Sequence, residues 1–267
     1  PVGDSRFMTT STDGSFAISA ANYLSMPMLP VGAGDLGTPC ADYVAMANRW
    51  DLPMDLRGGT PRMREQRDKW LPREEAESVE KYNIRIDHSF LSDHYADSCT
   101  RLSDRPFGKA AQVLGDEIPD LYHQIEINID GQGTTLTEQA NLLLLDALHF
   151  GKSHLFVDFT RLSPSATRAQ EQEVGARAVI RQISATDIIG WRSEVRGGIR
   201  QLTEVRWMER DVMVTPAEPY KDIIVERVRR ITPTEWELWQ KVRLTAGQQS
   251  IDRWIKIDGG PLTLGFI

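Results

Sequence analysis

The sequence has no long hydrophobic run. Apolar stretches such as Leu142–Leu145 are short, and this one is ended by Asp146. A helix that crosses a membrane needs about 20 consecutive, mainly apolar residues. We therefore expect no membrane-spanning helix and no membrane partner.

Cysteine is also scarce. The 267 residues include only Cys40 and Cys99, which lie far apart and in no CxxC or mixed Cys/His pattern. Disulfide frameworks and structural zinc sites need several such residues at close spacing. The sequence indicates neither of them and favours a reducing compartment such as a bacterial cytoplasm.

Basic residues are fewer than acidic residues. The chain has 31 Lys and Arg residues against 38 Asp and Glu residues, a formal net charge of −7. Proteins that bind nucleic acid without sequence preference depend on a dense basic surface that neutralises phosphates. Any contact with DNA is therefore expected to be local or loose.

Recognised catalytic motifs are missing. The chain contains no GxSxG, no GxGxxG and no paired-carboxylate signature. Gly151-Lys152-Ser153 resembles the end of a phosphate-binding loop, but Asp146 stands where that loop needs its first glycine. The sequence predicts no enzyme, with no catalytic residues and no cofactor, and favours a helix end at Gly151.

One group of residues leaves a metal site as an alternative. Asp87, His88, Asp93 and His94 are the densest set of possible ligands, and they would suit a metal-dependent hydrolase. However, ligands on one helix are normally three or four residues apart, whereas His88 and His94 are six apart. The pattern favours a solvated helix face, and no metal is expected.

The pattern along the chain predicts three regions and an α+β fold, with a helical N-terminal half and a mainly antiparallel, strand-rich C-terminal half. Residues 1–38 are rich in Gly, Pro, Ser and Thr and predict an extended or mobile arm. Residues 39–151 form the expected helical region, and residues 152–267 the expected β-rich region. The polar segment Ser163–Gly175 is the best internal linker.

Apolar residues at helical spacing predict four main helices, and Thr60-Pro61 offers a further helix start, a capping residue followed by proline. The first follows Thr38-Pro39 and ends before Pro53, a long one extends from Glu74 to about Asp104, and a short one covers Pro119–Ile127. The last follows Thr135 and Glu138, which have the spacing of a capping box. Alternating residues predict strands at Leu155–Phe159, Ala178–Ile183, Leu202–Glu209, Ile223–Ile231, Glu235–Val242 and Ile251–Ile257.

The aromatic and the basic clusters in the strand-rich half can each be interpreted in two ways. Five of the seven tryptophans lie there, and we expect Trp207, Trp236, Trp239 and Trp254 to pack in the core or between subunits rather than to stack on bases. Arg227, Arg229 and Arg230 form the one notable basic cluster, which a solvated strand edge explains as well as a phosphate contact.

A series of short landmarks occurs in order along the chain from Tyr43 onwards. They are Tyr43 and Trp50, Gly58-Gly59, Met63-Arg64, Leu71-Pro72, Tyr82-Asn83-Ile84-Arg85, Asp130-Gly131-Gln132-Gly133, Leu142–Leu145, Gly151, Val157-Asp158 and Ile188-Ile189-Gly190-Trp191-Arg192. Their order and spacing resemble the portal proteins of tailed double-stranded-DNA bacteriophages. The helix-then-sheet order would correspond to the wing region of such a portal.

The resemblance implies a structural function. Portal proteins form a ring, usually of twelve copies, at the one capsid vertex through which the genome is packaged and ejected and to which the tail attaches. The partners it implies are further copies of the chain, the major capsid protein, the terminase packaging motor, head-tail adaptor proteins and non-specifically contacted double-stranded DNA. The expected location is the portal vertex of the virion, after assembly in the cytoplasm of the bacterial host.

Two points stay open at the level of sequence. The family continues into a stem and a clip, which the resemblance places beyond residue 267, so no channel-lining or interface residue can be assigned. A different ring-forming virion adaptor remains an alternative to a portal, as does the metal-dependent hydrolase.

Overall fold

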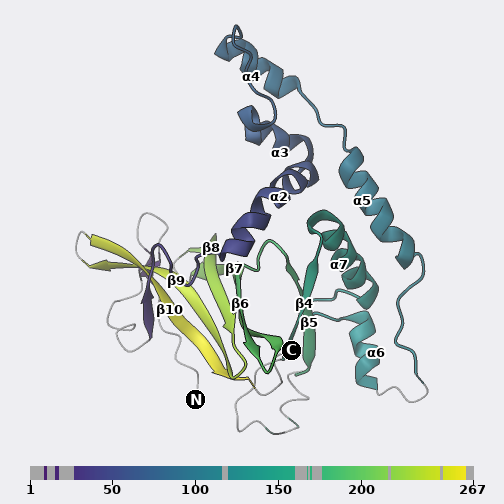
Figure 1. The fold of residues 1–267 in the computed structure, drawn as a ribbon, viewed down its shortest axis with the longest axis vertical. Coiled ribbons are helices and arrows are strands. Elements are labelled where there is room, and N and C mark those ends of the chain that lie inside the picture. Colours follow the sequence, from purple (N-terminus) through teal and green to yellow (C-terminus); the bar gives the residue numbers. More distant parts are fainter. Residues whose placement is uncertain are drawn as a thin grey trace. The chain divides into compact units, whose positions relative to one another are not determined.

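The computed structural model describes residues 9–10, 16–17, 27–115, 120–159, 167, 169, 176–215, 218–246 and 249–262. Its α+β class is as predicted, because helices dominate the first half of the described chain and antiparallel strands the second (Figure 1). Nearly all of the predicted linker Ser163–Gly175 lies outside the described residues. No helix within the described ranges is long and apolar enough to cross a membrane.

The chain divides into two compact units. The sheet unit comprises residues 1–44 and 187–267, and the helical unit comprises residues 45–186. The helical unit is thus an insertion between two parts of the sheet unit. The two boundaries fall inside the predicted helical region and inside the predicted β-rich region.

The sheet unit contains a six-stranded antiparallel sheet in the order β3-β10-β9-β8-β7-β6 (Figure 1). Its strands are β3 (Met28–Pro30), β6 (Gly190–Arg196), β7 (Ile199–Thr215), β8 (Glu218–Ile231), β9 (Glu235–Ala246) and β10 (Gln249–Pro261). The two short strands β1 (Thr9–Thr10) and β2 (Phe16–Ala17) pair with each other. β6 was not predicted, because it lies between glycines and its side chains are mostly polar.

The main core of the sheet unit consists of Ile189, Val228, Trp239 and Trp254. Part of the predicted arm packs against it: β3 pairs with β10, and Val31 and Leu36 contact this core. Asp35 accepts a 3.0 Å hydrogen bond from the indole Nε1 of Trp254. Residues 28–38 are therefore built into the unit by strand pairing and by the buried tryptophan.

The helical unit contains most of the helices (Figure 1). They are α2 (Ala41–Arg57), whose first residues belong to the sheet unit, α3 (Gly59–Gln66), α4 (Val79–His88), α5 (His94–Asp104), α6 (Asp120–Ile127) and α7 (Leu136–Phe150), with short 3₁₀ turns at Arg67–Lys69 and Arg105–Phe107. The strands β4 (Ser153–Phe159) and β5 (Ala178–Ser184) form a separate antiparallel pair.

The predicted end of the first helix was wrong. α2 continues through Pro53 to Arg57. A proline removes one backbone donor inside a helix, but Trp50 and Asp55 are buried on either side of it. Packing of these two side chains holds the helix together across the proline.

The predicted single helix from Glu74 to Asp104 was also wrong. The structure has α4 and α5, separated by residues 89–93. The guanidinium of Arg64 donates to the carbonyl oxygen of Ser89, and the Leu91 N–H donates to Thr60 Oγ1. Side chains from α3 therefore satisfy backbone groups that a continuous helix would have paired internally.

Candidate functional site

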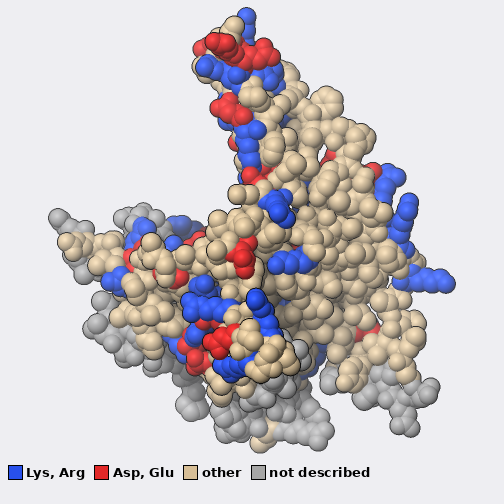
Figure 2. All heavy atoms as spheres, viewed as in Figure 1, with Lys and Arg blue, Asp and Glu red and all other residues tan. Residues whose placement is uncertain are grey.

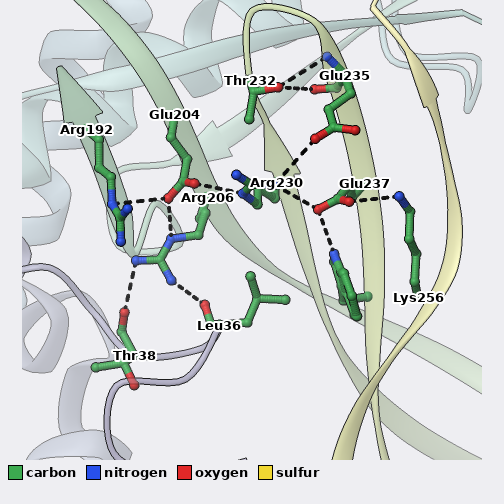
Figure 3. A network of polar contacts seen from close by, with 11 residues as sticks. Leu36, Thr38, Arg192, Glu204, Arg206, Arg230, Thr232, Glu235, Glu237 and Lys256 are labelled. Carbon is green, nitrogen blue, oxygen red and sulfur yellow. Dashed lines mark hydrogen bonds and ion pairs between the residues drawn. The ribbon is translucent and has the colours of Figure 1, made fainter. Parts of the chain in front are cut away.

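A network of charged side chains crosses one face of the main sheet (Figure 3). Glu204 forms ion pairs with Arg192, Arg206 and Arg230, the last at 2.7 Å. Arg206 also donates to the carbonyl oxygens of Leu36 and Thr38. The network therefore ties β6, β7 and β8 to the segment that leads into α2.

Glu237 is the second centre of this network (Figure 3). It accepts from Lys256 at 2.7 Å, from Arg230 at 3.0 Å and from the indole of Trp239 at 3.1 Å. Burial alone would raise the pKa of Glu237, but these three donors outweigh it and lower the pKa. The carboxylates of Glu204 and Glu237 are both paired with neighbouring cations. The network therefore holds the strands of the main sheet together and offers no open site for a ligand.

The basic cluster is neutralised in the same way. Arg227 pairs with Asp211, Arg229 with Glu209 at 2.6 Å, and Arg230 with the two glutamates of the network. The guanidinium of Arg229 also lies 5.9 Å from the ring centroid of Trp207. These arginines have acidic partners within the chain, which disfavours a phosphate contact.

Tryptophans of the strand-rich half lie mainly inside the protein, as predicted. Trp207, Trp239 and Trp254 are buried, and Trp236 is half-buried. Stacking on bases needs exposed ring faces. The three buried rings therefore belong to the core.

Gly151 ends α7 as predicted. Its backbone adopts a left-handed conformation with φ 79°, and its N–H donates to the carbonyl oxygen of Ala147. β4 follows almost at once, at Ser153. A phosphate-binding loop needs the reverse order, a strand before the glycine and a helix after it.

The proposed metal ligands are not brought together. Asp87 and His88 are the last residues of α4, whereas Asp93 and His94 lie at the start of α5, after the break that the sequence did not predict. Within the described part of the chain, no three His, Cys, Asp or Glu residues form a group able to hold a metal ion. The structure therefore gives the alternative metal site no geometric support.

Sequence patterns missed a buried carboxylate in the helical unit. Asp55 is fully buried and accepts hydrogen bonds from Arg62 at 2.9 Å, Lys69 at 2.7 Å and Trp70 at 2.7 Å. Burial opposes ionisation, but the hydrogen bonds prevail and the pKa of Asp55 is lowered. Asp55 connects α2 to α3 and to the 3₁₀ turn that follows.

The interior of the helical unit also holds a group of buried polar side chains. The buried His149 ring lies 3.1 Å from the hydroxyl of Tyr95, and the buried Asp146 accepts from Ser184 at 3.1 Å. Burial and the nearby Arg57 cation lower the pKa of His149, against the opposing effect of Asp146. This arrangement joins α5, α7 and β5 through hydrogen bonds.

An open hollow of about 630 Å³ lies in the helical unit. Its lining comes from α5, from α7 and from the turn before α7. The lining residues are Thr100, Ser103, Asp104, Gln132, Gly133, Thr134, Glu138, Asn141, Leu142 and Leu145. Because leucine side chains and carboxylates line the same hollow, it is a candidate binding site in the described part of the chain.

Many large apolar side chains of the helical unit face outward. Phe90 is 82% exposed, and Ile84 and Val157 are more than half exposed. The others are Leu52, Met54, Val79, Leu102, Leu114, Tyr122, Ile127, Leu142, Leu148 and Leu155. Figure 2 shows few charges over α7 in this view, whereas charges of both signs gather over α4. Apolar surface of this extent is typical of a protein that associates with others.

Several residues of the portal-like landmarks stabilise the fold through hydrogen bonds or core packing. Trp50 donates to the carbonyl oxygen of Phe150, and Tyr82 donates to that of Leu71. Asp130 accepts from the backbone of its own glycine-rich turn, and Ile189 belongs to the main core. Comparison with protein-family models and with curated proteins finds no match for the chain.

Proposed function

We propose that the chain is a structural subunit of a bacteriophage portal ring. The observation that carries the proposal is the ordered series of landmarks from Tyr43 to Arg192, which resembles the portal family. The α+β order of helices followed by an antiparallel sheet supports it. In this role the protein would stand at one vertex of the virion and surround the path of the genome.

The surface of the helical unit supports the self-associating part of the proposal. Its interior holds the polar residues Asp55, Gln139, Asp146 and His149, while many of its large aliphatic side chains are exposed. Buried polar groups together with exposed large apolar side chains are the informative departures from the usual distribution. Burial of the exposed residues against further copies would remove this apolar area from water.

The proposed partners follow from this role. They are other copies of the chain, the major capsid protein, the terminase motor, head-tail adaptor proteins and double-stranded DNA. A formal charge of −7 agrees with DNA that slides past the protein without binding tightly.

Mass photometry followed by negative-stain imaging tests the proposal. Twelve copies of the 30.2 kDa chain would give a particle of about 362 kDa with a central channel. The measurement is made on this chain and on any form that continues past residue 267. Monomers in every preparation would contradict the proposal.

The same images separate a portal from another ring-forming virion adaptor. A closed ring of about twelve subunits with a channel wide enough for duplex DNA is the expected result. A ring of clearly different copy number or a channel too narrow for a duplex would favour the adaptor.

A further inference from the structure

We infer that the tip of the β6–β7 hairpin of one copy docks in the α5–α7 hollow of a second copy. This inference rests on the proposed function, because it names the contact through which copies would associate. The proposed contact involves two different surfaces of the chain, one from each copy, which differ in shape and in charge. We call them the tip (Val195–Arg200) and the hollow.

The tip is narrow, exposed and basic. Gly197 and Gly198 form a two-residue turn with φ 59° and 80°, a conformation that glycine adopts readily and that keeps the strands paired up to the turn. Val195 and Ile199 are each 66% exposed. Exposed aliphatic side chains at the end of a narrow hairpin have a shape that suits insertion into a partner.

Two arginines accompany these aliphatic residues. Val195 lies opposite Arg200 and Arg196 lies opposite Ile199, so each face of the tip carries one aliphatic and one basic side chain. Arg196 pairs with the exposed Glu194 at 3.1 Å. Arg200 is exposed and forms no ion pair with any residue that the structure describes.

The hollow has the complementary character. Leu142 and Leu145 supply apolar contacts, and Asp104 and Glu138 place carboxylates at its wall. Glu138 is engaged in the cap of α7, whereas Asp104 is exposed and its Oδ1 accepts from the amide of Asn141 at 2.7 Å. The second oxygen of Asp104 can therefore receive a guanidinium.

Asn141 supplies an independent sign of a missing donor. Its Nδ2 group donates to Asp104, which fixes the orientation of the amide. Its Oδ1 atom is buried and accepts no hydrogen bond from the described residues. Buried acceptors are normally paired, so this wall of the hollow lacks one hydrogen-bond donor among the described residues.

Size and symmetry agree with this pairing. A volume of about 630 Å³ lies within the range of pockets that hold a small ligand or a few side chains. A ring requires a heterologous interface, in which one surface of a subunit meets a different surface of the next. The tip and the hollow lie on different units of the chain and provide such a pair.

Charge reversal on each side tests the inference. The tip variant carries Arg196→Glu and Arg200→Glu, and the hollow variant carries Asp104→Lys and Gln132→Lys. Each variant alone would bring like charges together, so we expect self-association to weaken by at least about tenfold in Kd. Mass photometry and sedimentation velocity measure association, and circular dichroism checks that both variants fold.

Mixing the two variants gives the decisive result. The acidic tip of one then meets the basic hollow of the other, and the two native surfaces also meet, so an equimolar mixture should regain wild-type association. The matched control carries Arg210→Glu and Lys221→Glu, the same change of charge on β7 and β8, and should associate normally. Restoration only when both changes are in the same chain would show a contact within one molecule and overturn the inference.

The outcomes distinguish this inference from the proposed function. Normal assembly of the tip variant, or a mixture that stays dissociated, would overturn the tip–hollow contact and leave the ring intact as a proposal. A tip variant that assembles normally but loses binding to a 30-bp duplex would assign the tip to DNA instead. A wild-type chain that never associates would overturn both.

Discussion

At the scale of single residues, the buried ionic groups matter most for stability. Asp55 is surrounded by three donors from different segments, so it determines how α2 meets α3. No sequence pattern predicts it, because an aspartate inside a helix is ordinarily exposed. Only the fold shows that Arg62, Lys69 and Trp70 converge on it.

We predict that Asp55→Ala lowers the free energy of unfolding by about 2 kcal/mol, because it removes a buried carboxylate that accepts three hydrogen bonds, two of them from cations. Urea unfolding followed by tryptophan fluorescence measures this. Asp51→Ala is the control: Asp51 contacts the same Lys69 at 2.6 Å, but its side chain is 52% exposed, so its loss should cost less than about 1 kcal/mol. Equal effects of the two substitutions would contradict the role given to Asp55.

Buried histidine makes the helical unit sensitive to pH. The pKa of His149 is lowered mainly by burial and then by Arg57, and the pKa of the half-buried His154 is lowered mainly by burial and then by Lys152. Asp146 opposes both shifts. The unfolded chain therefore binds more protons than the folded chain below the ordinary histidine pKa of about 6.5.

We predict that the contribution of these histidines to the free energy of unfolding is fully present above about pH 6.5. It falls as the pH drops below that value, by at most about 1.4 kcal/mol per pH unit for each histidine. Urea unfolding at pH 7.5 and pH 5.5 measures the difference. His149→Gln should reduce this pH dependence, whereas the exposed His88→Gln should leave it unchanged. A pH dependence that survives replacement of both His149 and His154 would refute this explanation.

At the scale of elements, local signals predicted the short helix α6 and the last helix α7, but they failed for the end of α2 and for the break between α4 and α5. Thr135 and Glu138 form the predicted capping box: Thr135 Oγ1 accepts from the Glu138 N–H at 3.2 Å, and Glu138 accepts from the Thr135 N–H at 2.8 Å. These contacts depend on residues three positions apart, so the sequence contains all the information. The break after α4 depends on Arg64, 25 residues away from Ser89, and no local pattern contains it.

We predict that Thr135→Ala destabilises the helical unit by about 1 kcal/mol, since it leaves the N-terminal N–H groups of α7 without their side-chain acceptor. Thr135→Ser keeps the hydroxyl and should cost much less. Thermal unfolding followed by circular dichroism compares the two. An alanine variant as stable as the serine variant would show that the cap contributes nothing.

At the scale of the whole molecule, the class of fold was predictable and the division into units was not. The change from helical to alternating spacing near Gly151 predicts helices followed by an antiparallel sheet. However, the division depends on pairs such as Trp254 with Asp35 and Arg206 with Leu36, which are 219 and 170 residues apart. The sequence also did not predict the hollow, because its lining residues are distant in the sequence. Asp104 and Asn141, for example, come from separate helices.

The insertion of the helical unit into the sheet unit imposes an order on synthesis. Residues 45–186 leave the ribosome as a continuous block and can fold while the rest is being made. β3 must wait for β10, its partner, through more than 200 further residues. Closing so large a loop is entropically costly and slow, so the sheet unit is completed last. A nascent chain would thus present a finished helical unit to other chains before its own sheet has closed.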